Sequence, residues 1–237
     1  MILGGDGSIL NIAAQMGENQ IPVVGIQMGR FGFLSELTPN DCEDNLHKIL
    51  TGQATVQECM MLACTARRGG KITFSGMALN DAVLASQSIS RMVMLDMLID
   101  DGYVTTFHGD GIIVATPVGS TAHSLSAGGP IVEPTLDSWV ISPICSHALT
   151  ARPLVICASR RLAFSMKESR NPIVLTLDGQ RIHRLDLRDK LVIQKSPYSF
   201  RLVKVTGRTY FETLRQKFNW AGSSLANSGR RPGGADE

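Results

Sequence analysis

The 237-residue sequence lacks several features that would assign a protein class directly. It has no apolar run approaching the roughly 20 residues that span a bilayer, and no signal peptide is recognisable, so we expect a cytoplasmic protein without a membrane partner. Its five cysteines form no CxxC pair and are odd in number, which favours reduced thiols over a disulfide framework. The five histidines have no ligand spacing with cysteine, so a zinc site is not expected.

Strong charge is also absent. The net charge is +2 and charged residues make up 19% of the chain, so no field indicates nucleic acid as a partner. There is no GxSxG hydrolase elbow and no GxxxxGK[ST] phosphate loop, and Gly5-Asp6-Gly7 lacks the third glycine of the GxGxxG fingerprint. The length and a hydrophobic fraction of 43% are typical of a globular protein with one large or two modest domains.

Helix and strand signals alternate over the first 55 residues. A glycine-rich turn, Gly4–Ser8, leads into an apolar helical pattern with Ser8 as its expected N-cap. A β-branched run at Val23–Ile26 predicts a buried parallel strand. A further helix is expected from Thr38-Pro39, with an apolar face of Leu46, Ile49 and Leu50. Residues 1–55 therefore read as an α/β domain with a partial doubly wound sheet.

Short strand candidates dominate from about residue 56 to 205, which predicts an all-β second domain, a sandwich or similar. A final helix is expected at Tyr210–Phe218, and the small, polar residues 221–237 predict a disordered tail. The strand candidates are Met60–Arg67, Gly76–Leu84, Met92–Ile99, Tyr103–Phe107, Ile112–Ala115, Ser138–Ile144, Leu154–Ala158, Leu162–Met166, Ile173–Leu177, Leu185–Leu187, Leu191–Gln194 and Phe200–Val205.

The stretch Gly109–Val132 is the most informative part of the sequence. A buried strand at Ile112–Ala115 is followed by a Gly-containing loop and by two hydroxyls, Ser120-Thr121, where a helix could begin. Free N–H groups and hydroxyls at a positive helix end suit phosphate or ribose oxygens. The alternative is that Gly, Ser and Thr serve here only as turn and cap residues.

Three further positions carry candidate chemistry. Asp6 lies between glycines at the C-terminal end of a strand, where it could bind Mg²⁺ on a phosphate or take a proton from an attacking hydroxyl. Asn80-Asp81 interrupts an apolar run and could hold a ribose hydroxyl pair, or mark a turn or bulge. Asp110 lies in a second Gly-Asp-Gly. The sequence alone does not distinguish a functional aspartate here from an ordinary loop aspartate.

Taken together, these stretches resemble the NAD kinase family over about residues 2–220. The long central motif, Thr116–Val132, is highly specific to that family, whereas the first Gly-Asp-Gly is shared with lipid kinases of the diacylglycerol and sphingosine type. The supporting segments are Gly4–Ser8, Gly29–Leu34, Asn80-Asp81, Gly109–Gly111, Leu177–Gln180, Phe211-Glu212 and Asn219-Trp220.

The resemblance implies an enzyme that transfers the terminal phosphoryl group of ATP, or of polyphosphate, to the adenosine ribose 2′-hydroxyl of NAD to give NADP, with Mg²⁺ or another divalent cation arriving with the donor. It also implies a homodimer or homotetramer, and a final segment, 206–220, that returns to the first domain. By resemblance Asp6 is the catalytic carboxylate. The other implied NAD contacts are Gly7, Asn80, Asp81, Arg91, His108, Asp110, Thr121, Ala122, His123, Ser124, Leu125, Ser126 and Gln180.

The sequence departs from the family at three places. Ser8 stands where Thr is usual, and His123 stands where Tyr is usual, which reduces the area that can stack on a base. The strand-helix unit that usually precedes the first glycine turn is missing, because only Met1–Leu3 come before it. A non-catalytic NAD-binding fragment and a lipid kinase therefore stand as alternatives. The NAD kinase reading predicts that Asp6, Asp110 and the hydroxyls at Ser120-Thr121 converge on one dinucleotide between two unlike domains.

Overall fold

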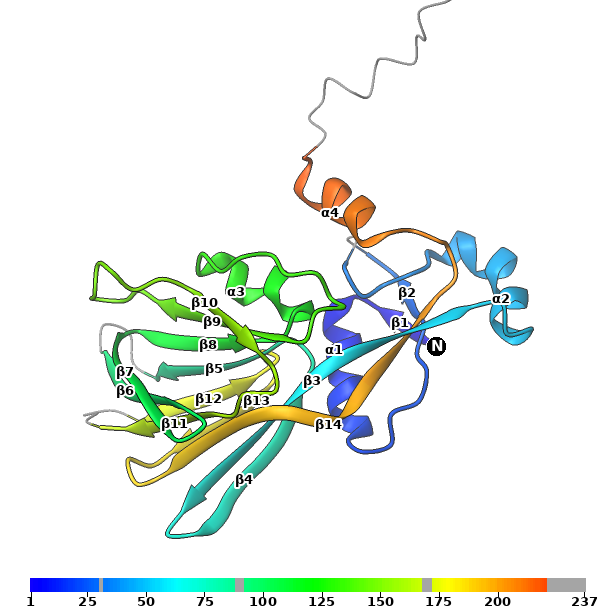
Figure 1. Cartoon of the computed structure of the whole chain (residues 1–237). Coiled ribbons are helices and arrows are strands. Elements are labelled where there is room, and N and C mark those ends of the chain that lie inside the picture. Colours follow the sequence, from blue (N-terminus) through cyan, green and yellow to red (C-terminus); the bar gives the residue numbers. More distant parts are fainter. Residues whose placement is uncertain (30–31, 88–91, 168–171, 221–237) are drawn as a thin grey trace, which may run out of the picture.

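The computed structural model describes residues 1–29, 32–87, 92–167 and 172–220. It consists of a small α/β part at the N-terminus and a β-sandwich of two six-stranded antiparallel sheets, with the C-terminal helix lying above the small part (Figure 1). This confirms the predicted fold class. Arg91 and the predicted tail at 221–237 lie outside the described residues.

The small α/β part is built on two parallel strands, β1 (Ile2–Gly4) and β2 (Gly25–Gln27), connected by helix α1 (Asp6–Met16). The helix begins two residues before the predicted N-cap: Gly5 takes the cap position in an extended conformation, and Ser8 lies inside the first turn. Asp6 is thereby the first helical residue, where a carboxylate interacts favourably with the helix dipole. Strand β2 is also shifted, since Val23 forms a bridge with Leu202 instead.

The second helical segment starts as predicted but does not bury the predicted face. A 3₁₀ turn, η1 (Pro39–Asp41), leads into α2 (Cys42–Leu50). Thr38 caps the start of η1 through a capping box of reciprocal hydrogen bonds with Asp41. Leu50 is 77% exposed and Leu46 is 39% exposed. Only Ile49 and Cys42 pack, against a small cluster around β2, so α2 rests on the edge of a two-stranded sheet rather than covering a wide one.

The sandwich contains two sheets, which we call sheet I and sheet II. Sheet I has the spatial order β10 (Leu154–Cys157), β9 (Ser138–Ile144), β8 (Gly111–Ala115), β5 (Asp81–Ser86), β12 (Ile173–Leu177), β13 (Arg181–Leu185). Sheet II has the order β4 (Lys71–Ala78), β3 (Thr55–Arg68), β14 (Lys190–Lys204), β11 (Leu162–Met166), β6 (Val93–Ile99), β7 (Gly102–Gly109).

Three strand predictions need correction. The run Gly76–Leu84 is two strands, because the chain turns at Leu79-Asn80 between β4 and β5. The alternating segment Leu185–Leu187 is the end of β13 followed by a turn in which Asp186 accepts a hydrogen bond from the Arg188 N–H. The last two candidates are one strand, β14, whose pairing with β3 shifts between Lys195 and Ser199.

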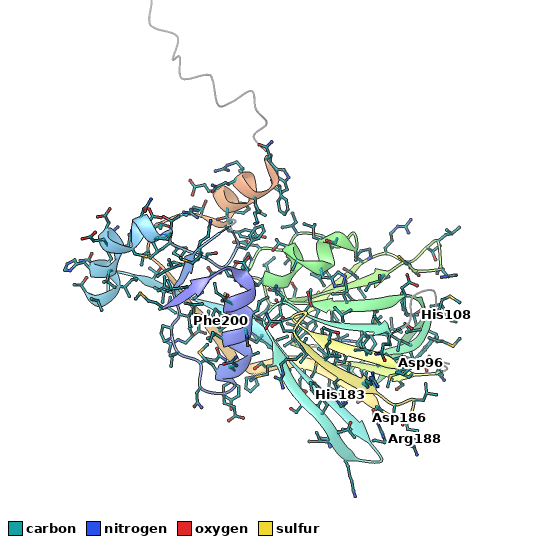
Figure 2. The ribbon with its side chains drawn as sticks, turned by 180° about the vertical axis from the view of Figure 1, so that it is seen from behind. Asp96, His108, His183, Asp186, Arg188 and Phe200 are labelled. Carbon is teal, nitrogen blue, oxygen red and sulfur yellow. The ribbon has the colours of Figure 1, made fainter. Side chains whose placement is uncertain are left out.

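The longest strands, β3 and β14, pair with each other and run from the sandwich into the small α/β part (Figure 1). One face of this pair contributes Leu62 and Ile193 to the main sandwich core. The opposite face contributes Met61 and Phe200 to a second core with Ile9 of α1; Phe200 lies beside α1 in Figure 2. The β3–β14 ribbon therefore fixes the small part on the sandwich.

Candidate functional site in the cleft between the α/β part and the sandwich

Asp6 follows directly on β1 and points into the loop after β2. Its carboxylate accepts hydrogen bonds from the backbone N–H groups of Phe33 (2.8 Å) and Leu34 (3.1 Å) and lies 3.4 Å from the Ser35 hydroxyl. A Cβ atom at Gly32 would overlap this carboxylate. The glycine is thus needed for the close approach of the loop to Asp6.

The far end of the same loop is held by a second carboxylate. Glu36 is 2% exposed and accepts hydrogen bonds from the Lys204 ammonium (2.9 Å) and from the Thr206 N–H (2.9 Å). Burial acts to raise the pKa of Glu36, but Lys204 and Thr206 outweigh it and hold the pKa below its usual value. Residues 32–36 are therefore fixed at both ends before any ligand binds.

A cavity of about 400 Å³, which we call the Asp6 cleft, opens beside this loop. Four of the residues predicted from the sequence line it together, namely Asp6, Asn80, Thr121 and Ala122. They come from the first helix, from the turn before β5 and from the segment after β8. The other lining residues are Phe33, Leu34, Val118, Lys217 and Phe218.

The turn that presents Asn80 is held by Asp178. The Asp178 carboxylate accepts hydrogen bonds from three consecutive backbone N–H groups, those of Leu79 (2.8 Å), Asn80 (2.7 Å) and Asp81 (3.1 Å). From the other side the Thr116 hydroxyl donates to the Leu79 carbonyl at 2.6 Å. The side-chain oxygen of Asn80 is buried and has no hydrogen-bond partner within the protein. A buried acceptor without a partner calls for an explanation, and a donor on a ligand in the cleft would supply one.

Asp81 and Asp178 form a buried carboxylate pair behind this turn. Burial, and then the charge of Asp178, raise the pKa of Asp81 to about 7. Burial also raises the pKa of Asp178, although the three backbone donors act against it. Near neutral pH, Asp81 therefore exchanges a proton readily and can act as donor or acceptor.

Gln180 reaches across from the sandwich to the small α/β part. It lies in the loop between β12 and β13, two residues after Asp178, and its side-chain amide donates to the Gly7 carbonyl at 2.8 Å. One short loop of sheet I thus positions both Asn80 and the start of α1.

The segment after β8 differs from the expected helix. It is a 3₁₀ turn, η2 (Val118–Thr121), followed by a four-residue helix, α3 (His123–Ser126). Most hydroxyls here serve the fold, since Ser120 donates to the Pro117 carbonyl and Thr121 to the Val118 carbonyl. The hydroxyls of the predicted helix start therefore bond within their own turn, and from this segment Val118, Thr121 and Ala122 line the cleft.

The residues of α3 stand apart from the cleft lining. Ser124 is fully buried and its hydroxyl pairs with that of Ser142 in β9 at 2.8 Å. That hydroxyl therefore anchors α3 on sheet I, and the contact of Ser124 with a dinucleotide stays a prediction. His123 and Ser126 are exposed and Leu125 is half-buried.

The predicted convergence of Asp6 with Asp110 is not seen within one chain. Asp110 is the turn between β7 and β8, and the whole of β8 separates it from Thr116 beside the cleft. His108 is exposed at the outer end of the sandwich (Figure 2) and lines a different cavity, of about 470 Å³. The roles of His108 and Asp110 in NAD binding remain predictions.

Asp178 and Lys217 are among the residues of the cleft region that were not identified as site residues from the sequence. Asp178 carries a weak signal, an Asp-Gly turn between two strand candidates. Lys217 carries none, because it reaches the cleft from the last helix, more than 200 positions from Asp6. Nowhere in the described ranges do three His, Cys, Asp or Glu side chains gather in a way that could hold a metal ion. The helices described are all too short or too polar to cross a membrane.

Comparison with known proteins extends this picture. The model of the ATP-NAD kinase N-terminal domain matches residues 1–54, and that of the ATP-NAD kinase C-terminal domain matches residues 79–205. The fold and the cleft thus define a kinase that acts on a nucleotide. An NAD kinase of Geotalea daltonii is 40% identical over 220 residues, covering 93% of this chain and 78% of the relative, and one of Rhodopirellula baltica is 41% identical, covering 94% and 71%. The chain belongs to the NAD kinase family.

Solved structures agree with this assignment. A yeast NADH kinase complexed with NADH superposes with a TM-score of 0.86 at 26% identity, covering 98% of this chain and 68% of that one. An NAD kinase from Archaeoglobus fulgidus in complex with ATP superposes with a TM-score of 0.76 at 28% identity, covering 92% and 81%. The lipid-kinase alternative receives no support from these relatives.

Proposed function

We propose that this protein transfers the terminal phosphoryl group of ATP, or of polyphosphate, to the adenosine ribose 2′-hydroxyl of NAD. The observation that carries the proposal is the placement of Asp6 in one cleft with Asn80 and Thr121, at the carboxyl end of a parallel strand. The chain's membership of the NAD kinase family supports it, and so does its likeness to a kinase solved with ATP.

The cleft places a carboxylate that can act as a base and an amide oxygen that can accept a hydrogen bond where a ribose could bind. Asp6 is held by two backbone N–H groups, so its carboxylate is oriented before substrate arrives. In the proposed reaction Asp6 takes the proton of the 2′-hydroxyl, a step that typically contributes a factor of about 10² to 10⁴. In this proposal the buried oxygen of Asn80 accepts a hydrogen bond from the dinucleotide, and Asp81 is the second proposed contact from the same turn.

Room for two substrates comes from a second cavity of about 390 Å³. It shares Phe33, Leu34, Val118 and Thr121 with the Asp6 cleft and extends toward Lys204 and Arg208. We place the dinucleotide and the phosphoryl donor across these adjoining spaces. The further NAD contacts that we propose are Gly7, Arg91, His108, Asp110, Thr121, Ala122, His123, Ser124, Leu125, Ser126 and Gln180.

A divalent cation is proposed to arrive on the phosphates of the donor. Asp6 is the one carboxylate among the described residues that line the cleft, so the protein offers too few ligands for a cage of its own. That donor set fits Mg²⁺, which usually keeps several waters and binds through one or two carboxylates plus substrate phosphates. The cation would neutralise phosphate charge.

Two proposals concern the protein beyond its site. We propose a cytoplasmic homodimer or homotetramer, in which apolar side chains exposed on the edge strands β7 and β10, such as Tyr103 (63%) and Val155 (45%), support a contact between copies. We also propose that residues 1–55 with 206–220 and residues 56–205 act as the two domains.

The test is an assay with NAD, ATP and Mg²⁺ in which NADP is measured by an NADP-specific dehydrogenase. Wild-type protein is expected to form NADP and Asp6→Ala to lose this activity. Calorimetry with NAD accompanies the assay. NAD binding without any NADP would identify a binding protein and overturn the proposed catalysis.

A further inference from the structure

Lys217 brings a positive charge into the Asp6 cleft. It lies in the last turn of α4 (Tyr210–Phe218) and is the single cationic side chain among the described residues that line the cavity. Its ammonium nitrogen is 6.0 Å from the centroid of the Phe33 ring. Because the Phe33 N–H is itself bonded to Asp6, the ammonium and the carboxylate are positioned around the same loop.

The helix that carries Lys217 is anchored on both walls of the cleft. The Phe33 ring of the α/β part lies 5.8 Å from the ring of Phe218 and 6.4 Å from that of Tyr210. The Tyr210 hydroxyl donates to the Val132 carbonyl at 3.3 Å, and Leu214 is buried. Thr209 and Glu212 close the start of α4 with a capping box. These contacts hold α4, and with it the backbone of Lys217, in a defined position beside the cleft.

The other polar side chains that line the cleft, Asp6, Asn80 and Thr121, carry no positive charge. The Asp6 carboxylate and the buried Asn80 oxygen both suit a hydroxyl donor, and neither attracts the anionic group that must approach that hydroxyl. Phosphoryl transfer is catalysed mainly by positioning and by neutralising charge on the moving group. Lys217 is the side chain of the cleft with the sign that this task requires.

We infer that Lys217 contacts the oxygens of the phosphoryl group during its transfer, an inference that rests on the proposed function. The ribose 2′-oxygen forms a bond to the γ-phosphorus of ATP as the bond to the β,γ-bridging oxygen breaks. The proton of the 2′-hydroxyl passes to Asp6, and ADP leaves with the electron pair of the broken bond. Lys217 remains an ammonium throughout and acts by its charge.

The experiment compares three full-length variants with the wild-type protein. Lys217→Met removes the charge and keeps most of the side-chain length. Lys217→Arg restores the charge. Arg215→Met makes the same change in charge on the same helix, at an exposed position that does not line the cleft. For each protein, kcat and the KM values for ATP and NAD are measured, with NAD affinity by calorimetry and Tm as a check of folding.

Lys217→Met is expected to lower kcat by about 10² to 10³, the usual effect of removing one group that stabilises transition-state charge. NAD affinity and Tm are expected to stay within twofold and within a few degrees of wild type. Lys217→Arg should recover a substantial part of kcat, and Arg215→Met should match wild type.

An unchanged kcat in Lys217→Met, or a raised KM for NAD at constant kcat, would overturn the inference, the latter by placing Lys217 on the dinucleotide. An inactive wild-type protein would overturn the proposed function itself. The two failures are thereby distinguished.

Discussion

The side chain of Gln180 donates a 2.8 Å hydrogen bond to the backbone carbonyl of Gly7, joining residues 173 positions apart in the chain. Gln180 belongs to the loop in which Asp178 holds the Asn80 turn. One loop of the sandwich therefore contacts both the start of α1 and the opposite wall of the cleft. This loop therefore links the part of the chain that carries Asp6 to the turn that carries Asn80.

Replacing Gln180 with Leu tests the connection. The bond is exposed, so the free energy of unfolding is expected to fall by about 1 kcal/mol or less. The KM for NAD is expected to rise severalfold, because the two walls lose a link that fixes their spacing. Urea denaturation and steady-state kinetics measure the two effects. An unchanged KM for NAD in the Gln180→Leu variant would show that Gln180 serves only the fold.

Gly32→Ala is expected to displace the Asp6 carboxylate, because the added Cβ would overlap it. Overpacking of this kind typically costs about 1–3 kcal/mol, and activity should fall at least tenfold since Asp6 loses its orientation. Gly29→Ala is the matched control in the same loop, where an added Cβ meets nothing within 4 Å. Equal activity of the two variants would contradict the role assigned to Gly32.

Asp178→Ala leaves three backbone N–H groups without their acceptor. Each buried unsatisfied donor costs about 1–3 kcal/mol, so the free energy of unfolding is expected to fall by at least about 3 kcal/mol. Asp186→Ala, in an exposed turn after β13, is the control and should cost less than about 1 kcal/mol. Similar losses in both variants, measured by urea denaturation, would rule out a special contribution of Asp178.

The pH dependence of stability should reveal Asp81. Its pKa in the folded protein, about 7, lies above the ordinary value of 3.8, so the folded state holds the proton more tightly than the unfolded state. This contribution is fully present below about pH 4 and is lost as the pH rises to about 7, by up to about 4 kcal/mol. Asp81→Asn carries no such charge. From pH 5 to pH 8 the wild-type protein should therefore lose stability that Asp81→Asn keeps, so the Tm of the variant should rise relative to that of wild type. A constant difference would show that Asp81 titrates normally.

Local sequence patterns predicted the parts of the site that lie next to their own secondary structure. Asp6 follows a strand, Asn80 interrupts an apolar run and Thr121 follows a buried strand, and all three line the Asp6 cleft. The predicted N-cap at Ser8 was wrong by three residues, because Gly5 takes the cap position and the helix begins at Asp6. Leu50 was wrong as a core residue because periodicity alone does not say how wide a sheet a helix has to cover.

Contacts between distant segments could not be predicted in this way. Asp178 acts on a turn almost 100 positions earlier, and Lys217 enters the cleft because α4 packs on Phe33. The same limit explains Ser124, whose hydroxyl belongs to a pair with Ser142 that only the packing of α3 on β9 creates. A motif gives the type of a residue and its neighbours along the chain, whereas these roles depend on which segment lies opposite.

The β3–β14 ribbon sets a limit on how this enzyme can move. The two strands, 14 and 15 residues long, span roughly 45 Å, and their pairing is interrupted only between Lys195 and Ser199. Hinge closure around a ligand requires a few backbone positions that absorb large changes in φ and ψ, and a continuous ladder of hydrogen bonds denies such freedom everywhere along the ribbon except at that bulge. We therefore expect the width of the Asp6 cleft to change little when substrates bind, with any closing movement of the small part confined to the bulge between Lys195 and Ser199.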